Sequence, residues 1–138
     1  MRHRVVGSLV LIAGLFLAAA PAVAHHSFAA EFDSNKPATM TGVVTKIEWT
    51  NPHAWFYINV KDEQTGKVSN WGFEMGPPHL LQRSGWSRDT MKIGDLVTVS
   101  GTMAKNGANR GNSRNVTFAS GPNKGKRLGA ASSETTNP

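Results

Sequence analysis

The chain has 138 residues, 39% of them hydrophobic, with a formal net charge of +6 and no cysteine. A chain of this length fits one domain, and the lack of cysteine excludes disulfides, thiolate metal ligands and thiol catalysis. The basic residues are spread through expected loops and the C-terminal end instead of forming one stripe, so we expect no nucleic-acid partner.

Residues 1–24 have the three parts of a secretory signal peptide. Arg2 and Arg4 give a positive start, residues 5–20 carry no charge, and an Ala-Val-Ala cleavage site ends at Ala24. A transmembrane anchor is the alternative, but a spanning helix needs ~20 apolar residues and this run is shorter. We therefore expect cleavage after Ala24, which lowers the net charge from +6 to +4. The product would be a periplasmic or secreted protein that does not span the membrane.

The remaining chain divides into three parts by composition. Residues 25–38 form an N-terminal arm without a sustained pattern, residues 39–119 form a β-barrel domain, and residues 120–138 form a flexible tail with little to bury. The expected strands of the domain are 39–50, 53–61, 68–75, 96–103 and 114–119. Two prolines, Pro77 and Pro78, stop the third strand and favour a short helix over 79–83.

The clearest strand is 53–61, because apolar and polar residues alternate along it. Its two faces are Ala54, Phe56, Ile58 and Val60 on the buried side, and His53, Trp55, Tyr57 and Asn59 on the outer side. Three strands, one short helix and two further strands is the element order of a small five-stranded Greek-key barrel of the oligonucleotide/oligosaccharide-binding (OB) type. A β-sandwich fragment and a small open sheet are the alternatives. The predicted fold class is therefore mostly β, with an OB-like barrel as the expected architecture.

Five short stretches of the sequence resemble those of one family. They are His25–Phe28, Glu48–Trp55, Asn70–Gly76, Gly85–Arg88 and Gly94–Gly101. In combination they resemble an uncharacterised family of short exported bacterial proteins, domain-of-unknown-function family 6152, over most of residues 25–118. The resemblance implies a secreted, single-domain β protein, and it carries no activity, substrate or catalytic residue across.

The sequence contains no familiar catalytic motif. It has no Gly-rich phosphate loop, no H-E-x-x-H and no G-x-S-x-G. Glu31, Glu48 and Glu74 could each act as a carboxylate, but an isolated carboxylate on a strand is usually solvated. We therefore expect a binding module and not an enzyme.

Three histidines suggest a metal site. Cleavage after Ala24 makes His25 the first residue, so its α-amine and imidazole can chelate one ion together, and His26 can add a second imidazole. His53 comes just after a turn, at the start of a strand, with an outward side chain. Amine and imidazole donors suit a divalent metal, and copper is favoured. The alternative is that these histidines are polar residues with no ligand role.

The outer face of strand 53–61 suggests a second kind of site. Trp55 and Tyr57 share this face, and small OB-type barrels bind ligands on the face of strands two and three. Stacked aromatic rings can hold a sugar, a peptide or a partner protein there. The alternative is that large residues at these positions only close the end of a small barrel.

Overall fold

The computed structural model describes residues 28–132, and these residues form one six-stranded sheet with two short helices. The elements in chain order are α2 (Phe28–Glu31), β1 (Phe32–Glu48), β2 (Trp55–Lys61), β3 (Val68–Glu74), α3 (Pro78–Arg83), β4 (Leu96–Ala104), β5 (Arg110–Phe118) and β6 (Arg127–Gly129). Neither helix in this range is long and apolar enough to cross a membrane.

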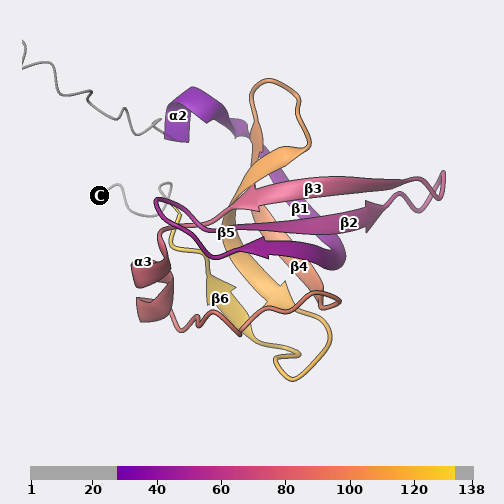
Figure 1. Cartoon of the computed structure of the whole chain (residues 1–138). Coiled ribbons are helices and arrows are strands. Elements are labelled where there is room, and N and C mark those ends of the chain that lie inside the picture. Colours follow the sequence, from indigo (N-terminus) through magenta and orange to yellow (C-terminus); the bar gives the residue numbers. More distant parts are fainter. Residues whose placement is uncertain (1–27, 133–138) are drawn as a thin grey trace, which may run out of the picture.

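The strands lie in the order β3-β2-β1-β4-β5-β6, and neighbours in this order are antiparallel (Figure 1). A further pairing joins β3 to β5 in parallel, through the partners Gly72 and Arg110, Phe73 and Gly111, and Glu74 and Asn112. β3, which is first in this order, therefore contacts β5, which is fifth. This contact brings together residues that are about 40 positions apart in the sequence.

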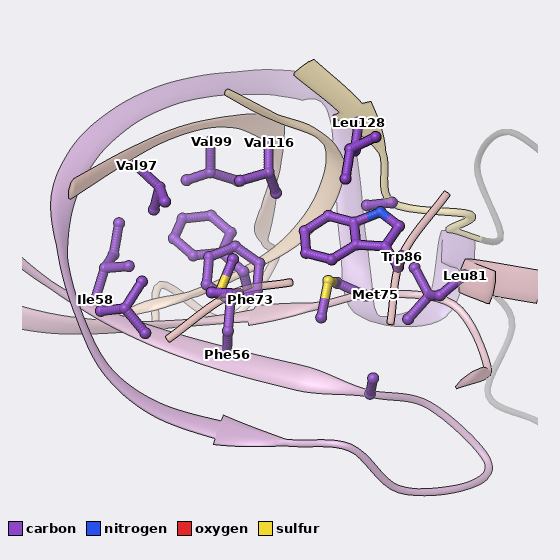
Figure 2. Packing of buried hydrophobic residues seen from close by; sticks show 14 of the residues in the cluster. Phe56, Ile58, Phe73, Met75, Leu81, Trp86, Val97, Val99, Val116 and Leu128 are labelled. Atoms are coloured by element: carbon purple, nitrogen blue, oxygen red, sulfur yellow. The ribbon is translucent and has the colours of Figure 1, made fainter. Parts of the chain in front are cut away.

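One apolar cluster fills the concave side of the sheet (Figure 2). Phe56 and Phe73 are stacked at its centre with ring centroids 5.6 Å apart, and they are 0% and 1% exposed. Strands β4 and β5 add Val97, Val99, Val116 and Phe118, and the segment from α3 onward adds Leu81 and Trp86. The predicted alternation in β2 is confirmed, because Phe56 and Ile58 are fully buried while Trp55 and Tyr57 are half-buried on the other face.

The prediction of a mostly β fold is confirmed, and a short helix does lie between the third and fourth strands. The first strand is longer than the sequence predicts, since it begins at Phe32 and not at residue 39. Phe32 pairs with Ala104 and is 3% exposed, while residues 33–36 form an irregularity before pairing resumes at Pro37. Half of the segment expected to be an arm, residues 32–38, is therefore part of the first strand, because Phe32 has an apolar surface to cover.

The segment after Ala119 also differs from the expected flexible tail. A sixth strand, β6, pairs with β5, and Leu128 and Ala130 are 8% and 0% exposed. The indole nitrogen of Trp86 donates to the carbonyl of Gly129 over 2.8 Å. Two apolar side chains and a strand edge are enough to order residues up to 132, although the composition of this stretch is polar. Residues 133–138 of the expected tail lie outside the described residues.

Truncation of neighbouring residues in β2 tests the face assignment. Phe56→Ala should lower the free energy of unfolding by ~3–5 kcal/mol, because it empties the centre of the core. Tyr57→Ala should cost much less, since this ring lies on the outer face. Urea denaturation of the two variants compares them directly, and equal losses would show that the faces are assigned wrongly.

Candidate functional site

The outer face of the sheet carries a contact between a histidine and a buried carboxyl where β2 begins and β3 ends. His53 Nδ1 contacts Glu74 Oε1, and the side chains are 30% and 8% exposed. Glu74 is paired with Trp55 across the two strands. Two backbone hydrogen bonds hold this end together, from Ala54 N to Gly76 O (3.1 Å) and from Met75 N to Ala54 O (2.9 Å). The strand ends therefore fix the carboxyl and the imidazole against each other.

Burial raises the pKa of Glu74 to about 7, because the ionised carboxyl is poorly solvated there. The negative charge of Glu31 raises the pKa further, and the positive charge of Arg110 lowers it. Either form of the carboxyl suits the contact with His53. An ionised Glu74 accepts the proton of Nδ1, and a protonated Glu74 donates to the same nitrogen. The pair can thus hold a proton near neutral pH.

Both aromatic rings on the outer face carry a cation. The Arg110 guanidinium lies 4.6 Å from the centre of the Trp55 ring, and Lys46 Nζ lies 5.1 Å from the centre of the Tyr57 ring. Such contacts are attractive because the face of an aromatic ring is electron-rich. Arg110 reaches Trp55 because the β3–β5 pairing places it beside Gly72. The rings therefore hold two positive charges at defined positions.

Tyr57 is fixed by its neighbours on two strands, β1 and β3. A Cβ on Gly72 would lie 2.9 Å from Tyr57 Cε1, so the ring fills the space that a side chain would occupy at that position. Its hydroxyl donates to Glu48 Oε2 over 3.0 Å, and Glu48 also forms an ion pair with Lys46. Burial and the Glu48 contact raise the pKa of Tyr57, so the hydroxyl stays protonated at neutral pH.

A hollow of about 180 Å³ opens beside this face, between α2 and the loop from β4 to β5. Its lining residues are Ala30, Glu31, Phe32, Ala104, Lys105, Asn106 and Arg110. Lys105 connects the two walls, since its backbone nitrogen donates to Glu31 O (2.9 Å) and its Nζ donates to Ala29 O. The helix α2 is thereby attached to the end of β4, and Glu31 is brought to the same side as Arg110.

A buried amide lies on the same face of the sheet. Asn112 is paired in parallel with Glu74, so both side chains point to the outer side. The residue is 1% exposed, and neither polar atom of its amide has a hydrogen-bond partner among residues 28–132. A buried polar group without a partner costs about 1–3 kcal/mol. The outer side of the sheet therefore contains buried polar groups, which are unusual on a face that serves only for packing.

Three of the five predicted site residues lie within the described part of the chain. His53, Trp55 and Tyr57 all lie on the outer face, as the alternation predicts. His25 and His26 lie outside the described residues. Within residues 28–132, no group of three or more His, Asp or Glu side chains is arranged to hold a metal ion.

The sequence reasoning missed the roles of Glu74 and Arg110. Glu74 was interpreted as a solvated carboxylate, but it is 6% exposed. Its burial and the position of Arg110 both follow from the β3–β5 pairing, which leaves no local pattern in the sequence. The signal in the sequence was the parity of Glu74, which places its side chain on the face of its strand opposite to Trp71, Phe73 and Met75.

Comparison with known proteins gives one match. A family model described as "Family of unknown function (DUF6152)" matches residues 13–114. No curated protein and no solved structure matches the chain.

Replacing Glu74 by glutamine should change how stability depends on pH. The unfolded carboxyl loses its proton near 4.5, whereas the folded one keeps it up to about 7. Ionisation is therefore resisted only in the folded protein, and the wild-type protein should lose stability as the pH rises through this window. Glu74→Gln removes this loss. Relative to the wild type, its free energy of unfolding should therefore increase by about 1–3 kcal/mol between about pH 5 and pH 8.

The matched control for this measurement is Glu48→Gln. Lys46 and Tyr57 lower the pKa of Glu48, so this carboxyl is ionised throughout the same window. The free energy of unfolding of Glu48→Gln, measured with denaturant, should depend on pH in the same way as that of the wild type. The same pH dependence for Glu74→Gln would show that Glu74 is solvated.

Proposed function

Because the chain belongs to the DUF6152 family, a family of unknown function, we propose its role from its geometry: it is a small exported binding module whose ligand carries an acidic group. The ligand is a sugar, a peptide or a partner protein, and it binds on the outer face of Trp55 and Tyr57. The observation that supports this proposal is the Arg110 guanidinium held over the Trp55 ring, because no described residue forms an ion pair with it, whereas Lys46 over the Tyr57 ring is already paired with Glu48. Export rests on the sequence of residues 1–24, which predicts a periplasmic or secreted protein.

The position of Arg110 over Trp55 favours some kinds of ligand over others. A neutral sugar that stacked on the covered face of Trp55 would have to displace the Arg110 guanidinium, which lies 4.6 Å from the ring centre. A carboxylate or another acidic group would instead bind the guanidinium where it already lies. Arg110 is exposed, and no described residue forms an ion pair with it. The arrangement thus favours an acidic ligand over a neutral one.

We also propose that β1 to β5 form an OB-like Greek-key barrel. The parallel contact between β3 and β5 supports this, since it joins the two ends of a five-strand series. In OB-type barrels the face of strands two and three is the ligand-binding face. Trp55 and Tyr57 lie on β2, and Glu74 lies on β3. The proposed site and the proposed fold therefore agree on the same surface.

The proposal is tested with triglutamate as an acidic probe and trilysine as its counterpart. Triglutamate should change the tryptophan fluorescence of the wild-type protein, and trilysine should not. Arg110→Gln should weaken triglutamate binding at least tenfold, about 1.4 kcal/mol, while Arg88→Gln, an exposed arginine after α3, should leave it unchanged. Trp55→Ala should abolish the fluorescence change and leave the protein folded. Equal binding by wild type and Arg110→Gln, or unfolding of Trp55→Ala, would contradict the proposal.

A second candidate function is divalent metal binding, with copper favoured, through His25, His26 and His53. One observation favours it: His53 Nδ1 is held by the Glu74 carboxylate. Histidines that bind metals usually make such a contact with their other nitrogen, because it fixes the orientation of the ring. His26 is two residues before Phe28, a reach of ~7 Å from the start of α2. Glu31, at the end of the same helix, acts on the pKa of Glu74.

Copper binding at the mature N-terminus is tested by moving the α-amine. A variant with Gly-Ser inserted before His25 keeps every imidazole but separates the amine from the His25 side chain. Its affinity for Cu(II) should fall at least tenfold, because amine and imidazole no longer form one chelate. Calorimetry and electron paramagnetic resonance compare the two forms. Unchanged affinity and an unchanged copper spectrum would leave only adventitious binding by histidine.

A further inference from the structure

The hollow beside the outer face has charges of both signs on its walls. Glu31 comes from α2, and Lys105 and Arg110 come from the two ends of the loop between β4 and β5. Among the residues that the structure describes, none of the three forms an ion pair with another. Charges that line one hollow and remain apart can each bind a different group of a ligand between them.

Each wall is held in place by contacts outside the hollow. Arg110 lies over the Trp55 ring and is paired with Gly72 along the β3–β5 contact. Glu31 is placed by the hydrogen bond from Lys105 N to its carbonyl oxygen. Lys105 is itself engaged, since its Nζ donates to Ala29 O. The cation and the anion left for a ligand are therefore Arg110 and Glu31.

The remaining part of the hollow is apolar. Phe32 and Ala104 face each other across the β1–β4 pairing, and they are 3% and 8% exposed. Phe28 packs on Phe32 with ring centroids 5.5 Å apart. These residues lie outside the main core cluster, so they form a separate apolar patch under α2. Little of this patch is left exposed, and the exposed apolar residue of the lining is Ala30.

We propose that this hollow binds a small zwitterion, namely an α-amino acid with an aliphatic side chain. Its carboxylate binds the Arg110 guanidinium, its ammonium group binds the Glu31 carboxylate, and its side chain packs beside Ala30. This rests on the proposed function and deepens it, because it names the ligand class for the acidic-group site at Arg110. A volume of about 180 Å³ equals that of about six liquid waters, which suits a molecule of this size.

Ligands with a single charge fit the hollow less well. A simple carboxylate would be attracted by Arg110 and Lys105 but would leave Glu31 without a partner, and a simple amine would be attracted by Glu31 but repelled by both cations. A zwitterion pairs with both Arg110 and Glu31, and neither residue has to change its charge. This difference separates the amino acid from its two singly charged analogues, which have the same aliphatic group.

The test is calorimetry of the purified protein with three matched probes. L-leucine has both charges, isocaproate lacks the ammonium group, and isoamylamine lacks the carboxylate. Leucine should bind at least tenfold more tightly than either analogue. Arg110→Gln should weaken leucine at least tenfold and leave isoamylamine no weaker. Glu31→Gln should weaken leucine at least tenfold and leave isocaproate no weaker. Lys67→Gln and Glu63→Gln, which change exposed residues away from the hollow, should leave leucine binding unchanged.

The proposal is overturned if isocaproate or isoamylamine binds as tightly as leucine, or if leucine does not bind at millimolar concentration. Near-ultraviolet circular dichroism of each variant checks that a loss of binding is not a loss of fold. If leucine fails while triglutamate still binds at Arg110, the zwitterion site is wrong and the acidic-ligand face stands. If neither leucine nor triglutamate binds, the proposed function is wrong as well as the zwitterion site.

Discussion

The parallel contact between β3 and β5 determines which residues can meet on the outer face. It places Arg110 beside Gly72 and Asn112 beside Glu74, although these partners are far apart in the chain. The contact requires close packing of the backbone. A Cβ on Gly111 would lie 2.8 Å from Phe73 Cε1, so only glycine lets β5 approach the core ring of β3 at this point. The stack of Arg110 on Trp55 and the burial of Glu74 both depend on this approach.

One side of the sheet is therefore an ordinary apolar core, and the other is a polar layer. On the core side, Phe56 and Phe73 are stacked and fully buried. On the outer side, Glu74 and Asn112 are paired between β3 and β5, and they are 6% and 1% exposed. Burying a carboxyl and an amide there opposes folding.

The sequence predicts the parts of the molecule that depend on local pattern. Alternation in residues 53–61 places Phe56 inside and Trp55 outside, and the prolines before α3 end β3 as expected. It does not predict β6, because Leu128 is the one large apolar residue in a polar stretch. It also does not predict that Glu74 is buried or that Arg110 stacks on Trp55. Both arise from a pairing between distant strands, for which no short-range signal exists.

Glu74 is a buried carboxyl held against His53 on the outer face of the sheet, beside the rings of the proposed binding site. The most direct measurement is the titration of its side-chain carboxyl carbon by nuclear magnetic resonance. We predict a midpoint of about 7 for Glu74, because burial and the charge of Glu31 oppose ionisation. A midpoint near the ordinary value of 4.5 would show that the carboxyl is solvated, and it would contradict this description of the site.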